Sequence, residues 1–284
     1  MDLKECFFFA ESLYRFFKDM QGEILKEFAN PTILIEKGPG DYVGALDMMM
    51  HRATRVSLPK LRPVPVIGEE VEEGETQFPW PPPFGDFWLR DELDGTDNFY
   101  AGFNDFGHQG ALFQNWEAVF SYIYVPIDEQ SMGNGFYFAG KGLGAWQRLA
   151  GGNKRPLSVT SKSDLSRAFI LLDGKSKDLP KSDFLNQVKL VSERNRNGFS
   201  FAVSTTRMAL GGFRPLGVDA IIAQNCKPWD IFPGKLIIEE AQHGKVVDWV
   251  GKPLAIDGIG NAIFYNGNDA LIAQILSKHV SKYI

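Results

Sequence analysis

This chain carries at residues 88–99 the stretch Trp88-Leu89-Arg90-Asp91-Glu92-Leu93-Asp94-Gly95-Thr96-Asp97-Asn98-Phe99. Two of its carboxylates, Asp91 and Asp94, stand three residues apart, directly before a glycine and a threonine. Carboxylates crowded in this way repel one another unless a cation lies between them. Hard divalent ions such as magnesium prefer oxygen ligands and leave positions open for substrate phosphates. The stretch therefore predicts a seat for metal ions and a phosphate, although Asp-Gly after an apolar segment is equally typical of a β-hairpin turn.

Two further acidic segments accompany this stretch. Lys227-Pro228-Trp229-Asp230-Ile231-Phe232-Pro233-Gly234 precedes the apolar-periodic run Lys235–Ala241, so we expect a helix to begin near Asp230. An aspartate in that position is also an ordinary N-cap, whose side chain accepts a hydrogen bond from a helix amide. Upstream, Val64–Ile67 predicts a short buried strand that ends in Gly68-Glu69-Glu70. Taken singly, a glutamate pair is usually a solvated surface feature.

Taken together and in this order, the segments resemble the inositol monophosphatase family, within the wider group of magnesium-dependent, lithium-sensitive phosphatases. Gly68-Glu69-Glu70 matches the family's Gly-Glu-Glu, and Asp91–Phe99 matches its Asp-Pro-(Ile/Leu)-Asp-Gly-Thr-x-Asn-Phe. Trp229–Phe232 matches its Trp-Asp-x-(Ala/Gly) helix start, and Lys37–Asp47 follows its early Lys…Asp-x-Val-x-x-x-Asp segment. Weaker likeness extends over most of the chain and includes Tyr137–Trp146 and Pro156–Thr160.

Helical periodicity marks the N-terminal part of the chain. Apolar residues at helical spacing over Leu3–Phe28 predict one or two amphipathic helices. Met48–Val56 predicts a further helix, and Pro59, Pro63 and Pro65 are expected to break its pattern.

Strand-like composition follows later in the chain. Ala118–Val125 and Gly135–Ala139 are rich in aromatic and β-branched residues and predict two strands, with a turn at Met132-Gly133-Asn134 between them. Alternating strands and helices are expected to continue through Phe169–Leu172, Phe184–Leu190, Ala220–Ile222 and Lys245–Trp249.

The resemblance implies an α/β fold, namely the five-layer α-β-α-β-α sandwich of the inositol monophosphatase and fructose-1,6-bisphosphatase type. It also implies two closely packed subdomains in one compact unit. We place the first, with most of the metal ligands, at residues 1–150 and the second, which completes the active site, at residues 151–284.

Composition limits the partners. The formal net charge of −5 argues against a nucleic-acid partner held by bulk electrostatics. Cys6 and Cys226 are the two cysteines, which gives no disulfide framework and fits a reducing, cytoplasmic location. The sequence predicts neither a signal peptide nor a membrane span.

The resemblance also implies a ligand set for two or three magnesium ions. Glu69, Asp91 and the main-chain carbonyl of Leu93 are expected to hold the first ion. Asp91, Asp94 and Asp230 are expected to hold the second. Asp47, together with Glu69, matches the position of a weaker third ion.

The same likeness assigns the reacting groups. Glu69 and Thr96 match the pair that orients the attacking water, and Asp94 is counted with them as catalytic. Gly95 and Thr96 are expected to present backbone amides to the phosphate, with Asp230 also at the substrate. A nucleophilic triad is poorly supported, because no recognisable motif with a serine or cysteine contains His51, His108, His243 or His279.

Departures from the family pattern concern the substrate. Ala223 stands where inositol-specific members commonly have a glutamate that binds a sugar hydroxyl, so Gln224 and Asn225 are the polar groups left to contact a polyol. Ser204-Thr205-Thr206-Arg207 replaces a small-residue segment near the substrate, which makes Thr205 and Arg207 candidate substrate contacts. Arg207 and Arg214 together are suited to a second phosphate.

Two other departures lie inside the motifs. Glu92 replaces the family proline and is expected to add a carboxylate beside the metals, and Phe232 stands where a small residue is usual and is expected to reshape the pocket.

The sequence therefore predicts a magnesium-dependent phosphatase of a small phosphorylated metabolite, with inositol-1-phosphate or a related sugar or polyol phosphate as the leading substrate. A bisphosphate such as fructose-1,6-bisphosphate or 3'-phosphoadenosine 5'-phosphate is the alternative, and a non-catalytic regulatory binding protein on the same fold is the competing class. The likeness also implies a homodimer. No membrane partner is expected.

Overall fold

Two helices form the first layer of the computed structural model, which describes the chain except for residues 39–40, 129–132, 175–182, 199, 258–259 and 281–284. α1 (Leu3–Ala29) is a single helix, so the prediction over Leu3–Phe28 is confirmed. Its buried residues recur at the three- and four-residue spacing of one helix face. They are Cys6, Phe9, Ala10, Leu13, Phe17 and Ile24.

The second helix of this layer is longer than predicted. α2 (Ala45–Leu61) begins three residues before Met48 and continues past Pro59. The expectation that Pro59 breaks the helix was wrong, because a proline in the last turn removes only one intrahelical hydrogen bond. Leu58 beside it is fully buried and holds this turn against the first sheet.

A seven-stranded sheet lies behind these helices, with its strands in the order of the chain. Neighbouring strands are antiparallel, except that β3 and β4 run parallel. The strands are β3 (Val66–Ile67), β4 (Phe87–Asp94), β5 (Gly107–Gln114), β6 (Glu117–Asp128), β7 (Gly133–Gly140), β8 (Gly144–Arg148) and β9 (Lys154–Pro156). A separate hairpin pairs β1 (Ile33–Gly38) with β2 (Asp41–Gly44).

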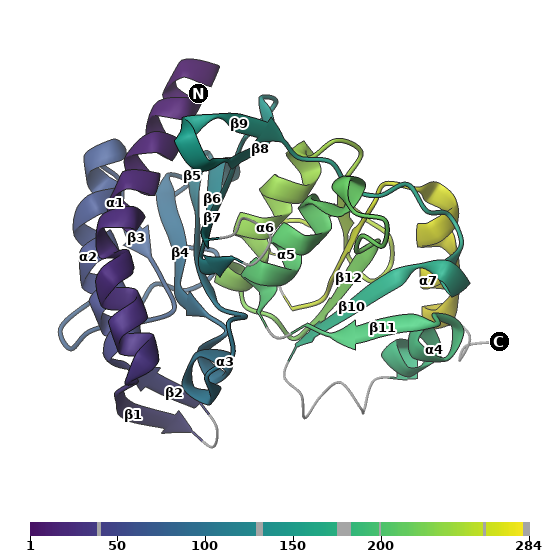
Figure 1. Ribbon diagram of the computed structural model, residues 1–284, viewed down its shortest axis with the longest axis horizontal. Coiled ribbons are helices and arrows are strands. Elements are labelled where there is room, and N and C mark those ends of the chain that lie inside the picture. The colour runs from purple at the N-terminus through teal and green to yellow at the C-terminus, as the bar shows by residue number, and fades with distance from the viewer. Residues whose placement is uncertain (39–40, 129–132, 175–182, 199, 258–259, 281–284) are drawn as a thin grey trace.

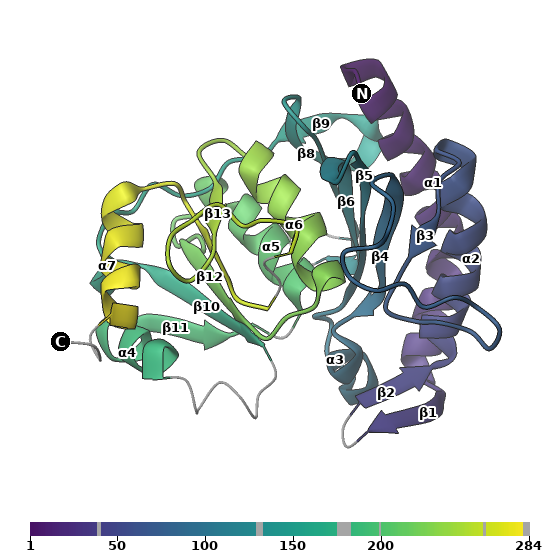
Figure 2. The ribbon, with the colours of Figure 1, turned by 180° about the vertical axis from the view of Figure 1, so that it is seen from behind.

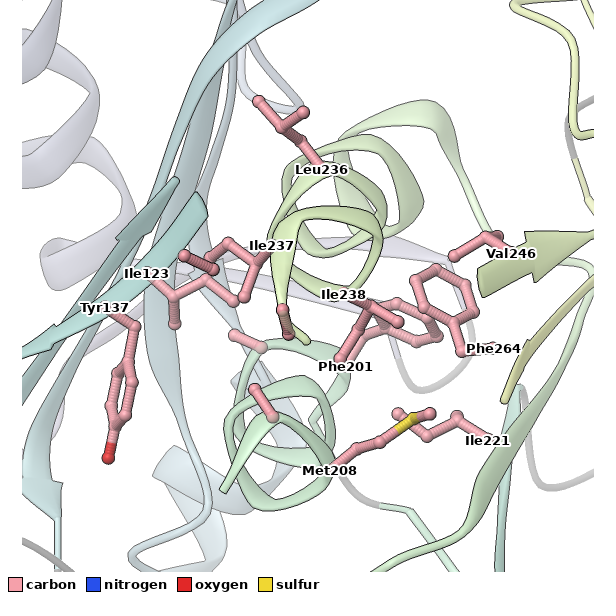
Figure 3. Packing of buried hydrophobic residues seen from close by; sticks show 14 of the residues in the cluster. Ile123, Tyr137, Phe201, Met208, Ile221, Leu236, Ile237, Ile238, Val246 and Phe264 are labelled. Carbon is pink, nitrogen blue, oxygen red and sulfur yellow. The ribbon is translucent and has the colours of Figure 1, made fainter. Parts of the chain in front are cut away.

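The central layer consists of two helices buried between the sheets, α5 (Phe201–Ala209) and α6 (Pro228–Glu240). Figure 3 shows Ile237 of α6 directed toward Ile123 of β6, whereas Ile238 is directed toward Val246 and Phe264 of the second sheet. A helix with apolar residues on opposite sides is buried on both sides, and here the first sheet covers one side of α6 and the second sheet covers the other. Both sheets therefore share one core across this layer.

The second sheet and its outer helices complete the fold (Figures 1 and 2). The sheet has the order β11-β10-β12-β14-β13. Its strands are β10 (Phe169–Gly174), β11 (Arg194–Asn197), β12 (Ala220–Gln224), β13 (Lys245–Val247) and β14 (Ala262–Tyr265). Its outer face is covered by α4 (Asp183–Val191) and α7 (Asp269–Val280). The last helix, α3 (Thr96–Ala101), follows β4 directly.

These layers confirm the α-β-α-β-α arrangement and the predicted strands within β6, β7, β10 and β12. The turn predicted at Met132-Gly133-Asn134 falls partly outside the described residues, and Gly133 and Asn134 already belong to β7. The first sheet continues to Pro156, so the division into residues 1–150 and 151–284 stays a prediction. Among the described residues, no helix combines the length and apolar character that a bilayer crossing requires.

The shared core makes a prediction about stability. Ile237 is fully buried, so Ile237→Ala should leave a cavity and lower the free energy of unfolding by about 2–5 kcal/mol. Leu190→Ala, on the exposed side of α4, is the matched control and should change it by less than about 0.5 kcal/mol. Urea denaturation followed by circular dichroism measures both values. Equal losses for the two variants would contradict the buried position of Ile237.

Candidate active site

The two carboxylates of the opening stretch lie on one face of β4 because the strand contains a bulge. Side chains three residues apart on a regular strand point to opposite faces. Asp91 pairs with Gln109 and Asp94 pairs with Gly107, so β4 uses three residues where β5 uses two. The extra residue of a bulge shifts the alternation by one position. Asp94 therefore joins Asp91, and the hairpin-turn alternative is wrong because these residues belong to a central strand.

Asp94 is anchored by residues that the sequence did not point to. Its Oδ2 accepts hydrogen bonds from the hydroxyl of Ser200 and from the main-chain N–H of Ala202, at 2.7 Å for the latter. Ser200 is the N-cap of α5. A serine directly before an apolar run is a recognised helix-start signal and would have located this helix end, although not its partner.

Asp230 brings the third carboxylate from α6. It lies in the first turn, and its Oδ2 accepts a hydrogen bond of 2.6 Å from the main-chain N–H of Lys227. Ligand atoms of Asp91, Asp94 and Asp230 all lie within 4.8 Å of one another. Residues from two separate elements, β4 with its bulge and α6, thus form one acidic cluster, which we call the aspartate cluster.

The electrostatics of the aspartate cluster are unfavourable without a cation. Burial, followed by the charges of Asp94 and Glu69, raises the pKa of Asp91 and of Asp230 well above the usual range. Burial also raises the pKa of Asp94 to about 6, against the hydrogen bonds from α5. The negative charge of Asp173, near the end of β10, also contributes to raising the pKa of Asp230. Asp173 was not among the site residues predicted from the sequence.

Glu69 and Asp47 differ in their relation to this cluster. Glu69 is partly buried after β3, and its charge acts on both Asp91 and Asp230. Asp47 caps the start of α2 by accepting a 2.9 Å hydrogen bond from Gly44 N–H. Burial and then the charge of Glu70 contribute to raising the pKa of Asp47 to about 7. Asp47 therefore neighbours Glu70 and lies beyond the aspartate cluster.

Leu93, Gly95 and Thr96 form the turn that links the bulge to α3. The carbonyl oxygen of Leu93 accepts a 2.8 Å hydrogen bond from Thr96 Oγ1. Gly95 has a φ of +85°, and a Cβ there would lie 2.6 Å from the carbonyl oxygen of Asp105. Glycine is therefore required by both backbone conformation and space. α3 begins at Thr96.

Two sequence expectations about departures were wrong. The carboxylate of Glu92 does not stand beside the aspartate cluster, because it lies on the opposite face of β4, where it contacts His51 at 3.1 Å. Phe232 does not face the cluster either. It packs against Trp80 and Phe113, because residues two positions apart on a helix, such as Asp230 and Phe232, differ in direction by about 200°.

The predicted substrate contacts of α5 are not brought to the aspartate cluster. Thr205 is fully buried, and its hydroxyl faces Gly234 of α6. Arg207 forms an ion pair with Asp105. Arg207 and Arg214, together with Arg196, line a cavity of about 830 Å³ on the side of α5 and β10.

The histidines take structural positions or lie at the surface. His51 and His108 are buried, and His108 contacts the main-chain oxygen of Glu92 and the hydroxyl of Tyr122. His243 is exposed, and the side chain of His279 lies outside the described residues. The cysteines are unpaired and buried.

The donor set fits a hard divalent cation. All of the converging groups offer oxygen atoms. Burial and mutual repulsion raise the pKa values of the carboxyl groups, and a bound cation would lower these pKa values again. A layered α/β fold with such a cluster defines the class of α/β proteins with a carboxylate metal site.

Comparison with known proteins places the chain in that class. The chain belongs to the inositol monophosphatase family, whose model matches residues 9–281, and this membership makes it a phosphomonoesterase. It is 28% identical over 273 residues to the fructose-1,6-bisphosphatase/inositol-1-monophosphatase of Aquifex aeolicus, covering 91% of this chain and 92% of that protein. It is 27% identical to rat inositol monophosphatase 1, covering 96% and 93%.

Solved structures agree on the fold. An IMPase/NADP phosphatase crystallised with Mg²⁺ and phosphate aligns with a TM-score of 0.72 at 21% identity, over 94% of this chain and 92% of that chain.

The raised pKa of Asp94 makes a prediction for the metal-free protein. A carboxyl with a raised folded-state pKa stabilises the fold fully below its unfolded value of 3.8, and this contribution is lost as the pH rises through about 6. A difference of about two pKa units corresponds to about 3 kcal/mol. In EDTA at pH 8, Asp94→Asn should therefore raise Tm by roughly 5–10 °C.

Scanning calorimetry of both proteins in EDTA measures this gain, which should shrink as the pH falls below about 6 and vanish below 3.8, where Asp94 is protonated in both the folded and the unfolded state. A variant with an unchanged or lower Tm at pH 8 would show that Asp94 is not under electrostatic strain.

Proposed function

We propose that this protein is a magnesium-dependent phosphatase that hydrolyses a small phosphomonoester by attack of an activated water. The observation that carries the proposal is the aspartate cluster, in which two carboxylates of β4 and one of α6 lie within 4.8 Å of one another. When bound, magnesium ions lower the pKa of a coordinated water and offset the charge of the phosphoryl group and leaving oxygen.

The residues fall into the roles expected from the family likeness. Asp91, Glu69 and the Leu93 carbonyl would hold one ion, and Asp91, Asp94 and Asp230 another. Asp47 would serve a third ion with Glu69, and the charge of Glu70 also acts on Asp47. The surrounding donors fix the carboxylates in place, since each of Asp91, Asp94 and Asp230 accepts a main-chain hydrogen bond.

Glu69 and Thr96 would orient the attacking water. Thr96 Oγ1 donates its hydrogen to the Leu93 carbonyl, so the lone pairs of this oxygen remain to accept a hydrogen bond from the water that is to lose a proton. The carboxylate of Glu69 is the stronger base and would take that proton. The main-chain N–H groups of Gly95 and Thr96 would bind phosphate oxygens, since the first amides of a helix have no partner within the helix.

A sugar-alcohol phosphate such as inositol-1-phosphate is the proposed substrate. Ala223 is fully buried and offers no acceptor for a hydroxyl group. Its neighbour Gln224, at the carboxyl end of β12, has a buried side-chain oxygen without a hydrogen-bond partner in the part of the chain that the structure describes. A hydroxyl next to the phosphate would satisfy this oxygen.

A bisphosphate substrate is the second candidate. The cavity that contains Arg196, Arg207 and Arg214 supports it, because guanidinium groups suit phosphate oxygens. The ion pair of Arg207 with Asp105 weakens this support. Faster magnesium-dependent hydrolysis of fructose-1,6-bisphosphate or 3'-phosphoadenosine 5'-phosphate than of inositol-1-phosphate would favour it.

A regulatory role without catalysis would follow from magnesium binding with no hydrolysis of any of these compounds. A homodimer and a cytoplasmic location stay predictions.

The metal ligand assignment is tested by Asp94→Asn. Loss of one charge from the aspartate cluster should lower phosphate release by roughly two orders of magnitude or more while the protein stays folded. Asp97→Asn, the same change at an exposed position three residues away, should leave turnover unchanged. Phosphate release with inositol-1-phosphate and magnesium measures both. Wild-type turnover in Asp94→Asn would reject the mechanism.

The role of Gln224 is tested by Gln224→Ala. Loss of one neutral hydrogen bond, worth about 0.5–1.5 kcal/mol, should raise KM for inositol-1-phosphate by roughly 2- to 10-fold. KM for phenyl phosphate, which has no hydroxyl groups beside its phosphate, should not change. Equal changes in KM for the two substrates would remove Gln224 from the substrate site.

A further inference from the structure

A second charged cluster lies on the opposite face of β4 from the aspartate cluster. It contains Arg90, Glu92 and His51, which are each no more than 2% exposed. Burying charged groups is costly unless they are paired and hydrogen-bonded. We call this group the Glu92 cluster, and Glu92 is its centre.

The two oxygens of Glu92 have different partners. Oε1 lies 3.1 Å from His51 Nδ1 and 3.2 Å from Arg90 Nη2. Oε2 accepts a 3.1 Å hydrogen bond from the main-chain N–H of Glu69 and a longer one, of 3.5 Å, from that of Glu70. The carboxylate of Glu92 therefore connects the buried guanidinium of Arg90 to the loop that carries Glu69.

The contact with this loop is close. A Cβ placed on Gly68 would come within 2.4 Å of Glu92 Oε1, so a side chain at this position would displace the carboxylate. The guanidinium of Arg90 and the ring of His51, both within 3.2 Å of Oε1, are partners that suit an ionised carboxylate. An ionised carboxylate accepts hydrogen bonds at both oxygens and donates none.

The Glu92 cluster also reaches α2. Arg90 Nη1 donates a 2.6 Å hydrogen bond to the His51 carbonyl oxygen. His51 stands four residues after Asp47, so the two residues share a face of α2. One network thus joins the strand of Asp91, the helix of Asp47 and the loop of Glu69. At its outer end, His51 Nε2 lies 3.0 Å from Glu75.

We propose that Glu92 is a positioning residue for the candidate magnesium centre, because its carboxylate holds the main chain at Glu69 in the place from which Glu69 reaches the ion. The inference rests on the proposed function, since it assumes that Glu69 and Asp91 bind magnesium. Residues that orient metal ligands typically change metal affinity by about 10- to 100-fold when they are mutated.

Glu92→Gln is the direct test. A glutamine keeps the shape of the side chain but turns one acceptor into a donor, which must face either the loop amides or the donors of Arg90 and His51. Titration calorimetry of the full-length protein with MgCl₂ measures binding without a substrate. We expect the Kd for Mg²⁺ to rise about 10-fold or more while circular dichroism stays that of the wild type.

Glu75→Gln is the matched control, because it alters the same network at the end that does not touch Glu69. We expect it to lower Tm but to leave the Kd for Mg²⁺ within about 2-fold of the wild type. If the two variants weaken Mg²⁺ binding equally, the Glu92 cluster is only a structural element and the inference fails.

Gly68→Ala reaches the same contact if Glu92→Gln does not fold. Its methyl group would displace Glu92 Oε1 without removing any charge, and it should raise the Kd for Mg²⁺ in the same way. A folded Glu92→Gln or Gly68→Ala protein with the wild-type Kd would overturn the inference and leave the proposed function intact. Absence of Mg²⁺ binding by the wild-type protein would overturn both.

Discussion

The mutual repulsion of Asp91, Asp94 and Asp230 is the constraint on which the rest of the site depends. Three buried or partly buried carboxylates within 4.8 Å of one another destabilise the fold in the absence of a cation. The protein holds them there with main-chain hydrogen bonds from the bulge of β4, from the start of α5 and from the start of α6. The first sheet supplies Asp91 and Asp94, and the central helix layer supplies Asp230, so the cluster lies where these two layers meet.

The buried charges on the two faces of β4 are balanced in different ways. On one face the aspartates lie without a basic partner among the described residues, which makes a cation the natural complement. On the other face Arg90 balances Glu92, so that cluster is satisfied within the protein. Glu92 links the two, because its hydrogen bond to the main chain of Glu69 crosses to the loop that serves the aspartate face.

The direction of each side chain decides whether a residue that departs from the family motif faces the aspartate cluster. Glu92 and Phe232 lie one and two residues from metal-ligand candidates, yet both point away from the aspartate cluster. Thr205 belongs to a segment that was matched to the substrate site, but the start of α5, at Ser200 and Ala202, is the part that contacts Asp94. Sequence distance along a helix or bulged strand does not report such directions.

The sequence alone determined the motifs, the family they resemble and the positions of most helices and strands, because these depend on local composition and on the 3.6- and 2-residue periods. It also supplied Asp91, Asp94 and Asp230 as candidates. Only the tertiary structure decided that they converge, since Asp91 and Asp94 share a face through a bulge defined by pairing with β5, and Asp230 arrives on a helix buried between two sheets. The contact of Glu92 with the loop before β4 likewise depends on packing between distant segments, which local periodicity does not encode.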